Sequence, residues 1–310
     1  MKGFVKKYWP ALLASLVLVI ISVLVYRAVL EVTGGVFVYA LDDAYIHMAM
    51  AKNVVAHGVW GVTPHEFSSS SSSPLWIVIL SLVYLITGVK LMMPFILNII
   101  FSFLSLLMLQ KLLHLFILNK VAIFSFLVGC IILLPIPIQI VSGMEHMLQV
   151  FFTLWFVYEL FNDVSPDWRL YAAGAFMTAT RYENMFLVVV VSLILFSKKY
   201  VKKSVFVLSA SLVPIISYGL VSLLNGWFFL PNGLLVKTRA GDPLFVIDRF
   251  LKSFLYVPER IFETQLYILF LFLLIVFLFV IFRKITVHYS KFFFLLKMFL
   301  GVFLFYLFFA

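Results

Sequence analysis

The sequence predicts an all-α, polytopic membrane protein with about nine or ten spans, and three observations support that fold class. Hydrophobic residues make up 65% of the 310 residues and charged residues 12%. Soluble domains contain roughly 45–50% apolar residues and about 25% charged residues. Runs such as "PALLASLVLVIISVLVY" and "QLYILFLFLLIVFLFVIF" approach the roughly 20 residues that a helix needs to cross a bilayer. These runs are apolar throughout, whereas the strands of a membrane barrel alternate apolar and polar residues.

The distribution of charge predicts the orientation in the membrane. The net charge is +10, which in a soluble protein would suggest a nucleic-acid partner. Here the basic residues lie mostly in short loops, as in the cytoplasmic loops of membrane proteins, so we expect membrane lipids and no nucleic acid as partners. Lys2, Lys6 and Lys7 place the N-terminus in the cytoplasm. We therefore expect a multi-pass protein of the cell (inner or cytoplasmic) membrane, with an uncleaved first segment.

The apolar segments predict the spans in order along the chain, beginning with residues 9–30. Residues 75–89 are short for a span, so we expect an interfacial or half-inserted helix there on the exterior side. A true span at this place would reverse the orientation of every later loop, against the charge bias. The other predicted spans are 92–112, 120–141, 145–161, 169–180, 184–197, 204–224, 264–282 and 292–310.

Two long loops are predicted on the exterior side, at residues 31–74 and 225–263. Loops of this length are usually functional or disordered, and we expect the first to be catalytic and to carry interfacial helices. Residues 1–310 are expected to form a single transmembrane module. Because the sequence stops within the apolar run "GVFLFYLFFA", we expect either that a C-terminal part of a longer chain is missing or that the last helix ends in the bilayer.

The adjacent acids Asp42 and Asp43 begin a predicted helix that Gly58 can end. We expect Asp42 to be the N-cap, and Asp43 lies four residues before His47, on the same helix face. One carboxylate suffices for a cap, so the second indicates a general base or a site for a divalent cation such as Mg, Mn or Ca. The alternative is that one acid caps the helix and the other only favours the helix dipole.

Further charged residues are predicted in exterior turns. Glu145 begins a span after "VSG", and Arg181 and Glu183 lie between the short predicted spans 169–180 and 184–197. Charges at membrane depth usually face a cavity or mark a site, so we expect this turn in a polar recess. The alternative is a structural ion pair of Arg181 with Glu145 or Glu183. Lys237 lies outside against the charge rule, which suggests an anionic partner such as a phosphate, or else lipid headgroups.

Two local patterns give weaker signals. The six serines at residues 68–73 predict a flexible linker, and Trp76, shortly after them, suits the membrane interface. Asn232 precedes a glycine and forms a turn signal.

Taken in order, the segments "DDAYIHMAMAKNVVAHG", "SSPLW", "SGME", "TRYEN" and "LPNGLLVKT" resemble the integral-membrane glycosyltransferases of the GT-C class. The branch with this pattern contains arabinofuranosyltransferase-like and mannosyltransferase-like proteins, and the resemblance covers about residues 39–238. The sequence departs from the usual Ser-Gly-Leu-Glu at Met144. It departs from the usual Thr-Arg-Pro-Glu-Gly at Tyr182 and Asn184, which we expect to loosen that turn.

The resemblance implies an inverting transfer of a sugar from a polyprenyl-phosphate donor to a glycan, lipid or protein acceptor of the cell envelope, on the exterior face. It implies that Asp42 or Asp43 is the general base, with a bound divalent metal in some members. Arg181 and Lys237 are the candidates for the donor phosphate. The remaining candidate substrate-binding residues are His47, Trp76, Glu145, Glu183 and Asn232. The rival class is a polytopic transporter or lipid flippase, which would show corresponding halves with polar residues near the midplane.

Overall fold

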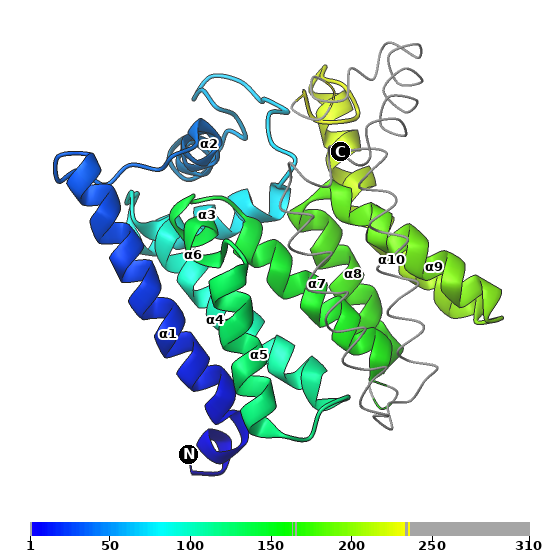
Figure 1. Cartoon of the computed structure of the whole chain (residues 1–310). Coiled ribbons are helices and arrows are strands. Elements are labelled where there is room, and N and C mark those ends of the chain that lie inside the picture. The colour runs from blue at the N-terminus through cyan, green and yellow to red at the C-terminus, as the bar shows by residue number, and fades with distance from the viewer. Residues whose placement is uncertain (1, 163, 165, 233–234, 236–310) are drawn as a thin grey trace, which may run out of the picture. The chain divides into compact units, whose positions relative to one another are not determined.

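The computed structural model describes residues 2–162, 164, 166–232 and 235, and within them it is all-α (Figure 1). The helices of this described part are α1 (Lys2–Val32), α2 (Asp42–His57), α3 (Pro74–Thr87), α4 (Met93–His114), α5 (Lys120–Leu133), α6 (Ile136–Val141), α7 (His146–Phe161), α8 (Asp167–Thr180), the 3-10 helix η1 (Tyr182–Asn184), α9 (Met185–Ser197) and α10 (Val201–Leu224). The chain divides into two compact units, one of Met1–Met185 with Val205–Gly233 and one of Phe186–Ser204 with Leu234–Ala310.

Three helices of the described residues are long and apolar enough to cross a membrane: α1, α4 and α10. Their mean hydropathy is 2.5, 2.0 and 2.0 respectively. The helices α3, α5 and α7, together with η1 and α9, are apolar but shorter. The all-α prediction is therefore confirmed for the described residues, and three of their helices could cross a membrane, while the total of about nine or ten spans stays a prediction.

One predicted span is not a single helix. Residues 120–141 form two helices, α5 and α6, separated at Leu134 and Pro135. Leu134 is extended, with φ −98° and ψ 150°, because a proline disfavours the helical conformation of the residue before it. The continuous apolar composition of this run concealed the break. The predicted spans 264–282 and 292–310 lie outside the described residues.

The helices of the first unit pack around two apolar clusters. The first joins α1 to α4, α5 and α6, and the small side chains of Ala11 and Ala14 let the neighbouring helices approach α1 closely. The second joins α2 to α3, with Met50 and Trp76 fully buried in it. Trp76 therefore lies in the core of the first unit, while its place relative to the membrane interface stays a prediction.

A polar side chain from α4 bridges α1 just after Pro10, which interrupts the regular hydrogen bonding of α1. The fully buried amide of Gln110 accepts the Ala11 N–H through Oε1 and donates through Nε2 to the Lys7 carbonyl, both at 2.9 Å. These two backbone groups pair with each other in an uninterrupted helix. We call this arrangement the Gln110 clamp. It joins α1 to α4 and gives both ends of a buried amide a partner.

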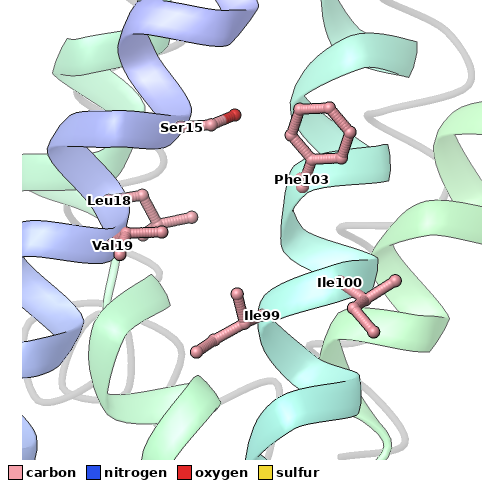
Figure 2. A pocket seen from close by; sticks show the side chains of 6 residues that line it. All are labelled: Ser15, Leu18, Val19, Ile99, Ile100 and Phe103. Carbon is pink, nitrogen blue, oxygen red and sulfur yellow. The ribbon is translucent and has the colours of Figure 1, made fainter.

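An apolar cavity of about 270 Å³ lies between α1 and α4 (Figure 2). Its lining consists of Ser15, Leu18, Val19, Ile99, Ile100 and Phe103. The Ser15 hydroxyl donates to the Ala11 carbonyl of its own helix at 2.7 Å, so this cavity offers a ligand only apolar surface.

Tyr39 fixes the start of α2 against the turn before α7. Its hydroxyl donates to the Leu91 carbonyl at 2.7 Å and accepts the Phe95 N–H at 3.2 Å. The Tyr39 ring lies so close to Gly143 that a Cβ there would be 2.6 Å from it, and Gly143 has a φ of +72°. Only glycine meets both demands readily. This contact brings α2 near the turn that ends at Glu145.

Candidate functional site

The helix α2 presents the two adjacent acids in its first turn. It ends at Gly58, which has a φ of +67°, as predicted. The prediction that Asp42 is the N-cap is wrong: Leu41 holds that position with an extended conformation, and no side chain caps the helix. Asp42 is the first helical residue, and its Oδ1 accepts the Asp43 N–H at 3.1 Å. Both carboxylates remain well placed for the helix dipole, but neither is needed as a cap.

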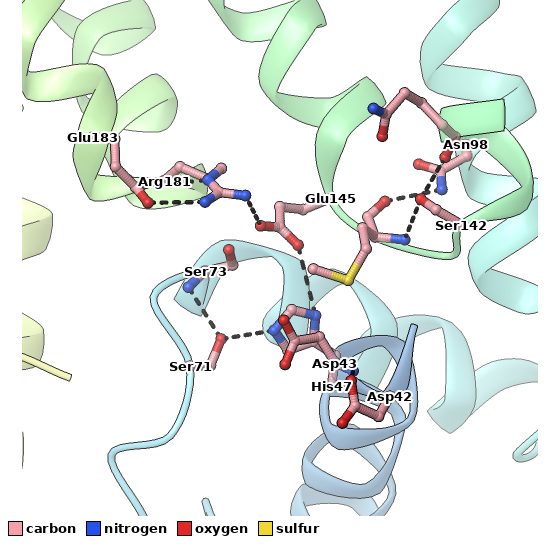
Figure 3. A network of polar contacts seen from close by, with 12 residues as sticks. Asp42, Asp43, His47, Ser71, Ser73, Asn98, Ser142, Glu145, Arg181 and Glu183 are labelled. Atoms are coloured by element: carbon pink, nitrogen blue, oxygen red, sulfur yellow. Dashed lines mark hydrogen bonds and ion pairs between the residues drawn. The ribbon is translucent and has the colours of Figure 1, made fainter. Parts of the chain in front are cut away.

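One turn after Asp43, His47 is buried and faces Glu145 (Figure 3). Nδ1 of His47 lies 3.6 Å from Oε2 of Glu145, slightly beyond hydrogen-bond distance. Glu145 is only 1% exposed, and its carboxylate comes from the turn between α6 and α7. Within the described residues, neither of these two atoms has another hydrogen-bond partner.

Arg181 links Glu145 to Glu183. Its Nη1 donates to Oε1 of Glu145 at 3.0 Å, and its Nη2 donates to Oε1 of Glu183 at 2.8 Å. The structure thus contains the ion pair considered for Arg181, with both carboxylates at once. We call His47, Glu145, Arg181 and Glu183 the carboxylate cluster. Two carboxylates face one guanidinium, so the cluster retains a net negative charge.

Burial and pairing together set the charge states of the carboxylate cluster. Burial disfavours the Glu145 anion, but His47 and Arg181 outweigh it and hold the pKa of Glu145 below its ordinary value. For Glu183, burial is likewise outweighed by the hydrogen bond and charge of Arg181, and its pKa is lowered. Burial also lowers the pKa of His47, because it disfavours the cation more than Glu145 and Asp43 favour it. At neutral pH both glutamates are ionised and His47 is neutral.

The serine segment, residues 68–73, forms no regular secondary structure, as predicted for a linker, and its flexibility stays a prediction. The alternate residues Ser69, Ser71 and Ser73 are nevertheless buried. The Ser71 Oγ lies 3.1 Å from Nε2 of His47 and accepts the Ser73 N–H at 3.0 Å. The serine-rich composition of this segment indicates flexibility, but it does not show that every second serine is buried.

The other predicted site residues fall in different places. The backbone N–H of Asn232 donates to the Ser69 carbonyl at 2.9 Å, which ties residue 232 to the serine segment. Trp76 is 0% exposed and packs in the core of α2 and α3. Lys237 lies outside the described residues.

Sequence reasoning missed several polar residues that hold the carboxylate cluster. Asn98 of α4 donates to the Met144 carbonyl at 2.9 Å, which supports the turn before Glu145 (Figure 3). Asn184 accepts from Gln149 at 2.9 Å and donates to the Met177 carbonyl at 2.7 Å. The expectation that Asn184 loosens the turn is therefore wrong. Asn98 in α4 and Gln149 in α7 are amide side chains within apolar runs, and that pattern could have indicated this support.

No group of three or more His, Cys, Asp and Glu side chains in the described part of the chain could hold a metal ion. Asp42 and Asp43 supply two neighbouring carboxylates, so they fit only an ion that keeps water or phosphate oxygens among its ligands. Mg²⁺ is such an ion.

A scan against protein-family models, a search of curated proteins and a search of solved structures each found no match to this chain. The described structure defines an all-α protein with three candidate membrane-spanning helices.

Proposed function

We propose that this chain is a GT-C-type membrane glycosyltransferase, which transfers a sugar from a polyprenyl-phosphate donor to a cell-envelope acceptor on the exterior face. The main support is that polar residues from three motif segments, far apart in the sequence, contact one another. His47 of α2 faces Glu145 at 3.6 Å, and Glu145 binds Arg181 at 3.0 Å. These are the segments whose order carries the resemblance to this class.

Asp43 is the better candidate for the general base. It is half-buried and lies on the face of α2 that also carries His47, whereas Asp42 is exposed. In the proposed reaction the acceptor hydroxyl attacks the anomeric carbon and gives its proton to the Asp43 carboxylate. The bond from that carbon to the phosphate oxygen breaks, and polyprenyl phosphate leaves with the bonding electrons. An in-line displacement of this kind inverts the anomeric centre.

The donor phosphate needs more positive charge than the described cluster offers. Arg181 is already bound by two carboxylates, so it reaches a phosphate by exchanging the more exposed one, Glu183, whose side chain is 37% exposed. Lys237, or a divalent cation held by Asp42 and Asp43, would supply the remaining charge. A divalent ion would neutralise the leaving phosphate.

The test is sugar transfer in membranes that contain single Asp43→Asn and Asp42→Asn variants, with labelled polyprenyl-phosphate sugars as donors. We expect Asp43→Asn to lose about 100-fold or more, the usual contribution of a general base. Glu66→Gln is the matched control, because Glu66 is an exposed acid of the same loop and does not belong to the cluster. Adding a chelator to the wild-type assay separates metal-assisted transfer from base catalysis alone. Normal transfer by both aspartate variants at normal expression would remove the proposal.

A further inference from the structure

The contacts on the two sides of the His47 ring determine which nitrogen carries the proton. The Ser71 Oγ accepts the Ser73 N–H at 3.0 Å and lies 3.1 Å from Nε2 of His47. On the other side of the ring, Nδ1 faces Oε2 of Glu145 at 3.6 Å. A neutral imidazole has one donor nitrogen and one acceptor nitrogen, so only two arrangements are possible.

In the first arrangement, Nε2–H donates to Ser71, and the lone pair of Nδ1 points at an ionised carboxylate. Two acceptors then face each other in a buried place, which is unfavourable. In the second arrangement, the Ser71 hydroxyl donates to Nε2, and Nδ1–H points at Glu145. Every polar atom of this contact chain then has a complementary neighbour. The second arrangement is the one that the surroundings favour.

We propose that His47 and Ser71 act together as positioning residues of the candidate site: the Ser71 hydroxyl orients the ring through Nε2, and Nδ1–H holds the second oxygen of Glu145. The first oxygen of Glu145 is thereby directed at Arg181. His47 is too buried to touch a substrate, so it serves the site through Glu145. The effect on sugar transfer rests on the proposed function, whereas the tautomer of His47 does not.

The order serine, imidazole, carboxylate also occurs in nucleophilic triads. Ser71 is only 2% exposed, and its oxygen already accepts the Ser73 N–H. These two features favour a positioning role over attack on a substrate.

Two amide substitutions at His47 separate the two nitrogens. In His47→Asn the side-chain amide lies near the position of Nδ1 and still donates to Glu145. In His47→Gln it lies near the position of Nε2 and keeps only the contact with Ser71. We expect His47→Asn to transfer sugar within about threefold of wild type and His47→Gln to lose about tenfold, as for one lost polar contact with a charged group. The reverse order would overturn the proposal.

The role of Ser71 is tested in the same assay. Ser71→Ala is expected to reduce sugar transfer several-fold. Ser71→Thr, which keeps the hydroxyl, should transfer sugar like the wild type, whereas Ser71→Val, which has the shape of threonine without its hydroxyl, should not. In the His47→Asn background, Ser71→Ala should have no further effect, because the nitrogen that it contacts is gone. Ser69→Ala is the matched control, since Ser69 is equally buried in the serine segment but does not contact His47. An equal loss in Ser69→Ala would contradict a specific role for Ser71.

A second measurement does not depend on activity. Nitrogen-15 NMR of the purified full chain, with labelled histidine, distinguishes the two neutral tautomers, and His47→Gln assigns the His47 signal among the six histidines. We expect protonation at Nδ1 in the wild type. Protonation at Nε2 would overturn the inference. If Nδ1 carries the proton but the wild type transfers no sugar from any donor, the proposed function fails and the tautomer assignment stands.

Discussion

The Gln110 clamp and the carboxylate cluster bury polar side chains to the same extent but satisfy them differently. Gln110 is 0% exposed, and its amide makes two hydrogen bonds of 2.9 Å to α1. Glu145 is 1% exposed, yet its Oε2 and the facing Nδ1 of His47 remain 3.6 Å apart without another partner in the described residues. The clamp is complete by itself, whereas the cluster is charged and only partly paired.

This difference indicates different roles for the two regions. A buried polar group without a partner costs about 1–3 kcal/mol of folding free energy. Native proteins usually retain such unfavourable groups at functional sites. The clamp joins two helices where Pro10 has disturbed one of them, and both polar atoms of its neutral amide have partners. The carboxylate cluster keeps capacity for a ligand or for a small rearrangement. We therefore propose that the clamp serves stability and that the cluster serves function.

The largest effect on stability is expected from Arg181→Met, which leaves Glu145 ionised, buried and without its cation. Removing one partner of a buried ion pair costs about 3 kcal/mol or more. The free energy of unfolding in detergent measures this loss, and adding Glu145→Gln to the variant should recover part of it. Arg169→Met is the control, because Arg169 is exposed. A loss no larger than that of Arg169→Met would show that the ion pair contributes little.

The Gln110 clamp is tested by Gln110→Leu, which leaves the Ala11 N–H and the Lys7 carbonyl without the bridging amide. We expect a loss of about 2 kcal/mol in the free energy of unfolding, while transfer per folded molecule stays unchanged. Gln139→Leu is the control, because that side chain is half-buried and bridges no backbone break. If Gln110→Leu reduced transfer per folded molecule as strongly as a cluster variant, the distinction between the two regions would fail.

The smallest effect is a pH dependence to which the cluster contributes, together with the neighbouring His146, whose pKa is also lowered by burial. The pKa values of His47, Glu145 and Glu183 are all lowered in the folded chain. The unfolded chain therefore binds more protons on acidification, so stability is retained above the unfolded pKa and lost as pH falls. The loss should begin near pH 6.5 with His47 and continue below about pH 4.5 with the glutamates, at no more than about 1.4 kcal/mol per pH unit and group.

Unfolding measured from pH 7.5 to 5 in wild type and His47→Asn separates the histidine part of this effect. The variant should be less sensitive to pH between 6.5 and 5 than the wild type. Gln110→Leu contains the same titrating groups and should keep the wild-type slope. Identical slopes for His47→Asn and wild type would contradict the assignment of this dependence to His47.

Sequence reasoning predicted those parts of the structure that depend on local chemistry. Apolar runs gave the positions of most helices, and Gly58 gave the end of α2. For Arg181, sequence reasoning gave a structural ion pair with Glu145 or Glu183 only as the alternative to a site role, and the structure contains both contacts. The break at Pro135 was missed because apolar composition is the same on both sides of it.

The contacts that assemble the site could not be predicted, because they depend on tertiary packing. Six identical serines carry no signal that separates Ser71 from its neighbours, and only the folded chain shows that it meets His47. An interfacial place for Trp76 followed from residue type alone, whereas packing of α2 on α3 buries it. The N-cap changed from Asp42 to Leu41 because backbone conformation, and not side-chain type, determined where α2 begins.

The most direct test of the account is sugar transfer per folded molecule, measured side by side for Asp43→Asn and Gln110→Leu. If the exterior acids perform the reaction and the clamp only stabilises the fold, Asp43→Asn loses about 100-fold or more and Gln110→Leu matches the wild type. Full transfer by Asp43→Asn, with a loss in Gln110→Leu, would contradict the account.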